Sequence, residues 1–278
     1  MVSREGTEQA LAMKFLMVRH LFRVAMCWLG WLTALGASAQ ESTNGLGCAD
    51  FLLAPLRVHL LTATNEPAIH TTLTSNDVTR ILGKVNRVWA QAGITFYLES
   101  LWVESATNTA SFRSMVKTND DSLLRLRPES SKSTNVFHIY YIKEFGVNGI
   151  CIRGINFVKD TASLRAVPGG IDEPLPRVTS HELGHALSLP HRQDTTNLLA
   201  SGTTGTWLNE SEIQQVRAAA KKLSWVDPAA EVRRKAEALK LPKQAAESRK
   251  LWQRIAHLPL DCEAARLARR HVEEAGKF

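Results

Sequence analysis

The sequence predicts an α+β fold, on the strength of three observations. Apolar residues alternate with polar ones over residues 56–60, which is typical of a strand. Over residues 78–89 apolar residues recur at steps of three and four, which is typical of an amphipathic helix. Further strand-like segments, a loop and a second helical segment follow. This order of strand, helix, three strands, loop and helix indicates a mixed layer in which helices pack on one sheet.

In the first strand, apolar side chains alternate with Arg57 and His59, so we expect one buried face and one polar face. The next helix begins at about residues 75–77, and Gly93 is well placed to end it. The apolar face of this helix is formed by Val78, Ile81, Leu82, Val85, Val88 and Trp89.

Three further strands are predicted at residues 94–103, 135–143 and 151–159, and Gly154 weakens the last of them. Residues 105–134 are polar and match no periodic pattern. Near the C-terminal end of the chain, a helix is expected up to about Leu223.

The N-terminal cap of the helix that ends near Leu223 is Asn209 or Ser211, and Glu212 could complete a capping box with Asn209. Residues 229–276 are rich in alanine and charged residues and are expected to be helical, with interruptions at Pro242 and Pro259. We therefore divide the chain into residues 1–39, a main domain at 40–227 and a helical extension at 228–278.

Residues 14–39 are typical of a secretory signal peptide. They combine basic residues, an apolar run of about a dozen residues and the small-x-small sequence Ala37-Ser38-Ala39 before Gln40. An uncleaved signal anchor is the alternative, but the apolar run is short for a membrane span. The sequence therefore predicts a secreted or periplasmic protein without stable membrane insertion after cleavage.

The net charge of +7 is unevenly distributed. Residues 40–227 contain 18 basic and 18 acidic residues, so the excess lies in the signal and in the tail. This distribution argues against a nucleic-acid partner, since no basic groove is expected near the centre of the fold. Cleavage leaves Cys48, Cys151 and Cys262, and export favours oxidation. We expect Cys48 to pair with Cys262, although spacing alone does not fix the pairing.

The chemistry is concentrated in the segment His181-Glu182-Leu183-Gly184-His185, an H-E-x-x-H arrangement. On a helix, His181 and His185 share one face and can bind one zinc ion, with Glu182 placed to act on the attacking water. A catalytic zinc needs a third protein ligand and an open fourth position. His191 can supply the third ligand, because Pro190 ends the helix and lets the chain turn back.

The segment from His181 to His191 resembles the extended zinc motif of the metzincin metallopeptidases, of the matrixin and pappalysin kind. The resemblance covers roughly residues 52–223. It implies a mixed, mostly parallel, twisted sheet with an antiparallel edge strand and two main helices in an upper half. It also implies a small, irregular lower half with a C-terminal helix. The implied activity is that of a zinc endopeptidase with one catalytic ion.

Two positions depart from the family pattern. Ser188 stands where the family has a glycine, which is costly if φ must be positive. Leu199 stands where the turn beneath the zinc carries methionine. Leucine and methionine have similar volumes, so such an exchange usually costs less than about 1.5 kcal/mol. Neither departure removes a ligand or the base.

The resemblance also implies how a substrate binds. The strand nearest the cleft, at about residues 150–157, is expected to bind a protein or peptide substrate as an added antiparallel strand. Residues 203–207 are expected to shape the specificity pocket. Glu182 is then the general base in peptide hydrolysis.

Other residues have simpler interpretations. His138 is expected to be a buried strand histidine rather than a ligand, and Tyr140 and Tyr141 receive no role. Asp194 is expected to stabilise a turn, so a structural Ca²⁺ has no support. Two rival functions remain: a binding protein that kept the fold without turnover, and a zinc amidase acting on non-protein amides.

Overall fold

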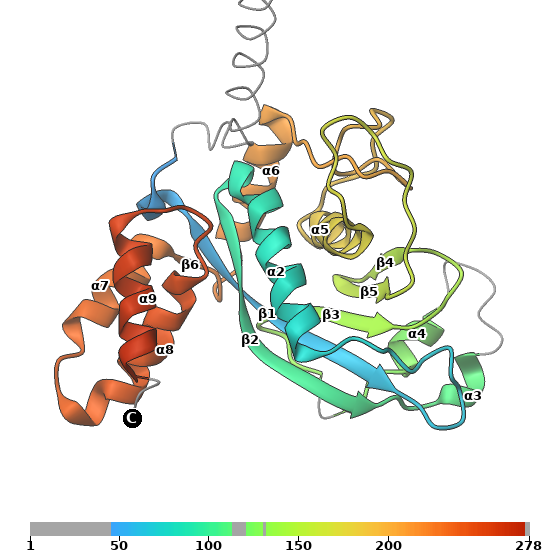
Figure 1. Ribbon diagram of the computed structural model, residues 1–278, viewed down its shortest axis with the longest axis horizontal. Coiled ribbons are helices and arrows are strands. Elements are labelled where there is room, and N and C mark those ends of the chain that lie inside the picture. The colour runs from blue at the N-terminus through green and yellow to red at the C-terminus, as the bar shows by residue number, and fades with distance from the viewer. Residues whose placement is uncertain (1–45, 113–120, 130–131, 276–278) are drawn as a thin grey trace, which may run out of the picture. The chain divides into compact units, whose positions relative to one another are not determined.

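A computed structural model describes residues 46–112, 121–129 and 132–275. The predicted signal segment lies outside these residues. The central sheet has the strand order β2-β1-β3-β5-β4 (Figure 1). Strands β2, β1, β3 and β5 run parallel, and β4 is antiparallel to β5 at one edge. The strands are β1 (Leu52–Thr62), β2 (Ile94–Ser105), β3 (Phe137–Ile142), β4 (Gly149–Ile152) and β5 (Ile155–Lys159). The predicted mixed, mostly parallel sheet with an antiparallel edge strand is confirmed.

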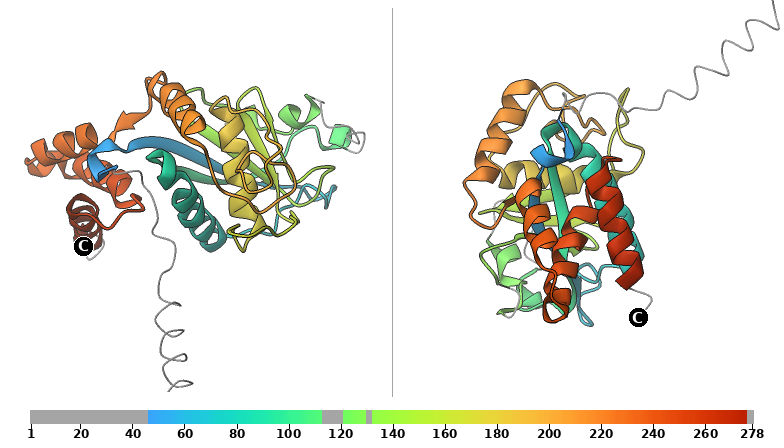
Figure 2. Two further views of the ribbon diagram at one scale, coloured as in Figure 1. Left: turned by 90° about the horizontal axis from the view of Figure 1, so that it is seen from above. Right: turned by 90° about the vertical axis from the view of Figure 1, so that its left-hand side faces the viewer.

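Two long helices, α2 (Ser75–Trp89) and α5 (Pro174–Ala186), lie on the same face of this sheet (Figures 1 and 2). Thr74 caps α2 and forms a capping box with Asp77. A short 3₁₀ turn, η3 (Ala90–Ala92), extends the helix to Gly93. The φ angle of Gly93 is +59°, so the predicted stop uses a left-handed conformation that glycine adopts without penalty. The apolar face of α2 is buried against alternate residues of β1.

The opposite face of β1 is also buried, and the prediction of a polar face is wrong. His59 is fully buried, and its ring stacks on Tyr140 with centroids 4.0 Å apart. Two short helices, α3 (Thr109–Phe112) and α4 (Ser122–Arg125), contribute apolar side chains to a second cluster on this side. The sequence of α3 and α4 has no clear period, and the alternating pattern of β1 does not show that these helices cover its second face.

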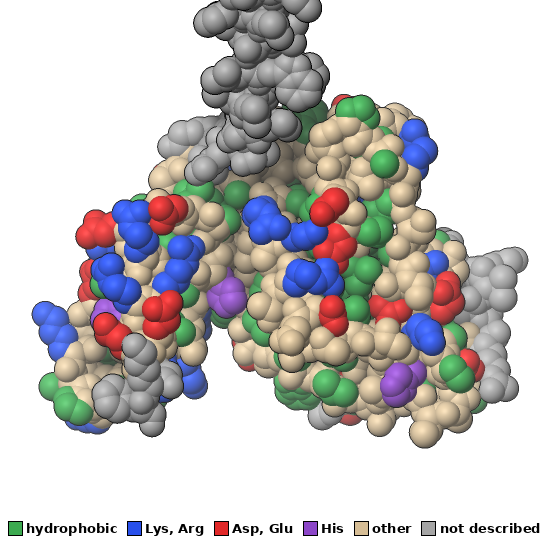
Figure 3. Space-filling view, in the orientation of Figure 1, with side chains coloured by type: hydrophobic (Ala, Val, Ile, Leu, Met, Phe, Trp, Pro, Cys, Tyr) green, Lys and Arg blue, Asp and Glu red, His purple; other side chains and the backbone are tan. Residues whose placement is uncertain are grey.

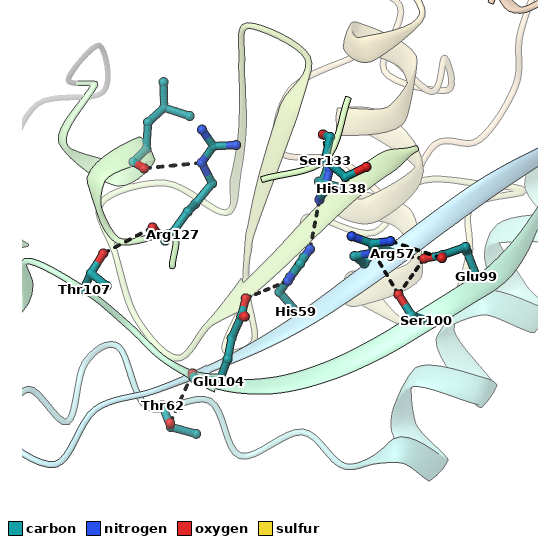
Figure 4. Close-up of polar contacts among 11 residues, drawn as sticks. Arg57, His59, Thr62, Glu99, Ser100, Glu104, Thr107, Arg127, Ser133 and His138 are labelled. Atoms are coloured by element: carbon teal, nitrogen blue, oxygen red, sulfur yellow. Dashed lines mark hydrogen bonds and ion pairs between the residues drawn. The ribbon is translucent and has the colours of Figure 1, made fainter. Parts of the chain in front are cut away.

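His59 belongs to a chain of hydrogen bonds through this second layer (Figure 4). His138 Nε2 lies 2.9 Å from the Ser133 carbonyl oxygen, which can only accept, so Nε2 carries a proton. His59 Nε2 then donates to His138 Nδ1 at 2.9 Å. His59 Nδ1 lies 2.7 Å from Glu104 Oε1, which extends this chain of contacts to β2. The predicted role of His138 as a satisfied strand histidine is confirmed.

The strand predicted at residues 151–159 is two strands. Arg153 and Gly154 both have positive φ angles, +52° and +78°, and form the two-residue turn between β4 and β5. The edge strand is therefore β4, and β5 lies inside the sheet. This difference moves the predicted substrate-binding strand from residues 150–157 to Gly149–Ile152.

The C-terminal region is helical as predicted. Asn209 caps α6 (Glu210–Lys221) and forms the expected capping box with Glu212. The tail comprises α7 (Ala229–Ala238), η5 (Pro242–Gln244), α8 (Ala245–Ala256) and α9 (Glu263–Ala275). A two-residue strand, β6 (Asp227–Pro228), pairs with the start of β1.

The tail packs on the start of the sheet. Its apolar side chains share one core with Phe51, Leu53 and Tyr97. The expected disulfide between Cys48, in η2 (Cys48–Asp50), and Cys262 is present. On the face that Figure 3 shows, basic and acidic side chains are interspersed over this helical region. In the described part of the chain, no helix has the length and apolar character needed to cross a membrane.

Candidate metal centre

Helix α5 carries the first two candidate ligands. It begins at Pro174, and proline is well tolerated in a first helical turn, where its missing N–H would have no partner. His181 is buried and His185 is half-buried, whereas His191 is exposed at the cleft. The structure brings all three imidazoles together, with one nitrogen of each within 4.8 Å of the others.

The turn after α5 has the hydrogen bonds of a Schellman motif. Leu189 N donates to the Gly184 carbonyl, and Ser188 N donates to the His185 carbonyl, both at 2.9 Å. Ser188 has a φ of +71°, so it adopts the left-handed conformation that the family glycine would adopt. Pro190 follows directly and prevents the helix from continuing. The turn therefore places His191 next to the other two histidines.

Backbone carbonyls fix the orientation of the two helical imidazoles. His181 Nδ1 donates to the Leu198 carbonyl at 2.8 Å, and His185 Nδ1 donates to the Leu189 carbonyl at 2.7 Å. In the neutral rings both Nε2 atoms then carry a lone pair and point towards the centre. Such hydrogen bonds from the second ring nitrogen are the usual support of metal-binding histidines.

The distances between these nitrogens test whether a metal fits. His185 Nε2 lies 3.0 Å from His181 Nε2 and 3.1 Å from His191 Nε2. Two lone pairs at this distance repel each other unless a proton or a cation lies between them. Nitrogens that bind one zinc tetrahedrally are separated by about 3.3 Å. The site is therefore a three-histidine arrangement compatible with zinc binding.

Glu182 lies beside this centre and is only 3 % exposed. Burial raises the pKa of its carboxyl to about 8, and the charge of Arg177 opposes this shift. Burial also lowers the pKa of His181 to about 3, and the nearby Arg177 charge adds to the effect. Burial lowers the pKa of His185 as well. The helical imidazoles therefore stay neutral, as metal ligation requires.

A cleft of about 780 Å³ opens onto the histidines and Glu182. One wall is β4, with Gly149, Ile150 and Cys151 at the cleft. Burial, followed by the charge of Glu182, raises the pKa of the Cys151 thiol to about 12, so the thiol is protonated at neutral pH. Ser201 and Gly202 also line the cleft, directly before residues 203–207, which are predicted to shape the specificity pocket.

Gly149 allows β4 to approach Glu182 closely. A Cβ atom at this position would lie 2.6 Å from Glu182 Oε1 and 2.6 Å from a methyl group of Val178. Only glycine therefore fits here without a shift of the strand or the carboxylate. Sequence reasoning missed this residue, because a glycine near a strand end has several common explanations.

The loop beneath the metal centre, residues 197–205, is held by charged residues from two helices. Glu212 of α6 is fully buried and accepts hydrogen bonds from Asn197 Nδ2 at 2.8 Å and Arg192 Nε at 2.5 Å. Arg177 of α5 contacts the same loop. Leu199 packs against Gly184, where an added Cβ atom would lie 3.2 Å from a terminal methyl group of Leu199. The loop thus fits closely under α5 with leucine in the methionine position.

The remaining candidates lie away from the centre. His59 and His138 occupy the second layer described above, and Tyr141 hydrogen-bonds to Thr179. Asp194 Oδ1 accepts hydrogen bonds from Thr196 N and Thr196 Oγ1 at 2.9 and 2.8 Å, which supports its expected role in a turn. In the described residues, the three histidines form the one group with metal-ligand geometry.

Comparison with known proteins gives a distant likeness to solved structures. No protein-family model matches the chain, and no curated protein matches it. Among solved structures, the chain is similar to archaemetzincin from Methanopyrus kandleri, with 13 % identity and a TM-score of 0.42. The match covers 60 % of this chain and 96 % of that one. A likeness this distant carries no argument about function.

Proposed function

We propose that the chain is a zinc-dependent endopeptidase, with His181, His185 and His191 as zinc ligands and Glu182 as general base. The observation that carries the proposal is the convergence of three imidazole nitrogens beside a buried carboxylate in an open cleft. Three histidines plus an open position is the usual composition of a catalytic rather than a structural zinc site.

The chemistry divides between the ion and the protein. A bound zinc ion would supply Lewis-acid activation of water and of the scissile carbonyl. Glu182 would accept the proton of the attacking water and pass it to the leaving amine. It must be ionised to do so, and a divalent cation held by the histidines would lower its pKa in the same direction as Arg177 does.

The substrate is proposed to be a protein or peptide that binds along β4. This strand ends the sheet and lines the cleft, so a substrate backbone could pair with its outer edge. We assign the chain to the metzincin type, near the matrixins and pappalysins, on the motif from His181 to His191, with Leu199 in place of the methionine of the turn. We further propose that it acts outside the cytoplasm, because residues 14–39 have the composition of an export signal.

The test uses Glu182→Ala with Glu247→Ala as a control, since Glu247 is an exposed acidic residue of α8. Cleavage of casein by the first variant should fall by about 10²–10⁴-fold, the usual contribution of a general base. Metal analysis should give close to one zinc per chain for both variants. The control should cleave as the wild type does.

Each rival function predicts a different result. A binding protein that lost turnover would hold zinc but cleave nothing in the wild type. A zinc amidase would hydrolyse small amides and leave a peptide library intact. Equal casein cleavage by Glu182→Ala and wild type would remove Glu182 from the mechanism.

A further inference from the structure

Arg177 is a buried cation whose part in the proposed reaction so far is its influence on the pKa of Glu182. It lies one helical turn before His181 and is only 1 % exposed. In the described residues its hydrogen-bond partners are backbone carbonyls and the ring of His181, and no carboxylate forms an ion pair with it. Burial lowers its pKa to about 10, so the side chain remains charged at neutral pH.

The guanidinium binds three carbonyls of the loop beneath the metal centre. Its Nε donates to Gly205 at 3.0 Å, and its Nη2 donates to Ala200 at 2.5 Å and Asn197 at 3.3 Å. These three residues span the loop from its beginning to its end. A planar group with donors in fixed directions therefore sets the shape of the whole loop.

The same loop supplies the carbonyl that orients His181. Leu198, between two of the residues that Arg177 binds, accepts the Nδ1 proton of His181 at 2.8 Å. Arg177 Nη1 lies 2.9 Å from that Nδ1 and packs directly against the ring. A guanidinium can only donate, so it hydrogen-bonds to Nδ1 when the ring proton is on Nε2. When Nε2 is free for a metal, the proton is on Nδ1 and the Leu198 carbonyl accepts it.

Fold stability alone is a poor explanation for a charge at this place. Replacing buried charged groups by apolar groups of similar volume is often neutral or stabilising in proteins. A loop could also satisfy its carbonyls with water or backbone donors. What an apolar side chain could not do is hold several carbonyls in fixed directions next to a ligand ring.

We propose that Arg177 is a positioning residue for the metal centre. It fixes the loop from Asn197 to Gly205, so that the Leu198 carbonyl holds His181 with Nε2 directed at the metal. This proposal rests on the proposed zinc site and adds to it a residue that is not itself a metal ligand.

The test compares Arg177→Met and Arg177→Lys in the full chain. Zinc affinity is measured by competition with a chromophoric chelator, and site geometry by the visible spectrum of the Co²⁺-substituted protein. We expect Arg177→Met to lose about 10–100-fold in zinc affinity, as is typical when support of a metal ligand is removed. Its Co²⁺ spectrum should change. Arg177→Lys keeps the charge and one donor group, and should recover part of both.

Kinetics separate positioning from substrate contact. Because Arg177 lies under the histidines, kcat should fall while KM stays within about twofold, as expected when ground-state binding is not altered. All measurements are made well below the unfolding temperature of each variant.

Arg217→Met is the matched control. Arg217 also donates to backbone carbonyls, namely those of Ala92, Gly93 and Asp50, but at a distance from the metal centre. Its loss should lower stability and leave zinc affinity and the Co²⁺ spectrum unchanged.

The possible outcomes are distinct. A wild-type chain that binds neither zinc nor Co²⁺ would overturn both the proposed function and the role of Arg177. A zinc-binding wild type with unchanged affinity and spectrum in both Arg177 variants would overturn the positioning role alone. If both variants fail to fold while Arg217→Met folds, Arg177 belongs to the fold and the positioning role is rejected.

Discussion

His185 Nδ1 lies 2.7 Å from the carbonyl oxygen of Leu189, the third residue beyond the end of α5. The turn that terminates the helix thus also orients one of its candidate ligands. The link between these two functions is Ser188, whose left-handed conformation places the Leu189 carbonyl under the ring. A local backbone feature and the metal centre therefore depend on the same residue.

Replacing Ser188 by glycine should stabilise the protein. A non-glycine residue in the left-handed region costs about 1–2 kcal/mol of strain, which glycine relieves. Part of this gain is lost again, because glycine also raises the conformational entropy of the unfolded chain. We expect the free energy of unfolding in urea to rise by up to about 1 kcal/mol. Zinc affinity should not change, because the turn is kept.

Gly202→Ala is the reverse control for this experiment. Gly202 has the same φ of +71° and open space around its Cα, so alanine should lose about 1 kcal/mol through strain alone. A destabilised Ser188→Gly protein would contradict the assignment of strain to this turn.

Replacing Gly149 by alanine should impair catalysis. The new methyl group would meet Glu182 Oε1 at 2.6 Å, so either β4 or the carboxylate must move. A displacement of this size can cost about 100-fold in rate when it affects a reacting group. We expect kcat/KM for a peptide substrate to fall by at least about tenfold, with the zinc content unchanged.

Gly146→Ala serves as the comparison, because a Cβ at Gly146 meets no atom within 4 Å. Full activity in both variants would show that β4 and Glu182 need not lie as close as they do here.

Acid should destabilise the layer that contains His59. Burial, followed by the charges of His138, Arg57 and Arg127, lowers the pKa of His59 to about 2. The unfolded state therefore takes up the proton first, and stability is lost as the pH falls from about 6.5 towards 2. One such group changes the free energy of unfolding by up to about 1.4 kcal/mol per pH unit.

The measurement is urea unfolding in the presence of a chelator at pH 4.5, 5.5 and 6.5. His59→Gln should be less stable than the wild type at pH 6.5, but its stability should depend less on pH. Because the pKa of Glu182 is raised in the fold, its titration stabilises the protein as the pH falls. This effect is the same in wild type and variant, so it cancels when their slopes are compared. The exposed His70→Asn control should keep the wild-type slope. An equal slope for His59→Gln would mean that His59 is not the group that titrates.

The convergence of the three candidate ligands could be predicted from sequence because their geometry is local. His181 and His185 are one helical turn apart, and Pro190 forces the turn that brings in His191. The disulfide between Cys48 and Cys262 was also predicted, although spacing alone did not fix it.

The features that sequence reasoning missed depend on distant parts of the chain. Arg177 looks like any helical arginine until its carbonyl partners, twenty or more residues later, are in place. The hairpin at Arg153 and Gly154 lacks the asparagine or aspartate that usually marks such a turn, so the glycine was interpreted as a weak point in one strand. The burial of the second face of β1 was missed for the same reason, because the side chains that cover this face come from short helices and from the tail.

The bond between Cys48 and Cys262, which are 214 positions apart in the sequence, closes a covalent ring that includes the residues lining the cleft. A single backbone cut anywhere inside that ring leaves the two fragments attached. If the protein cleaves itself, a nicked molecule will therefore migrate as one chain in electrophoresis until a thiol reductant is added. Self-processing should be assayed with and without reduction, since oxidised samples alone would conceal it.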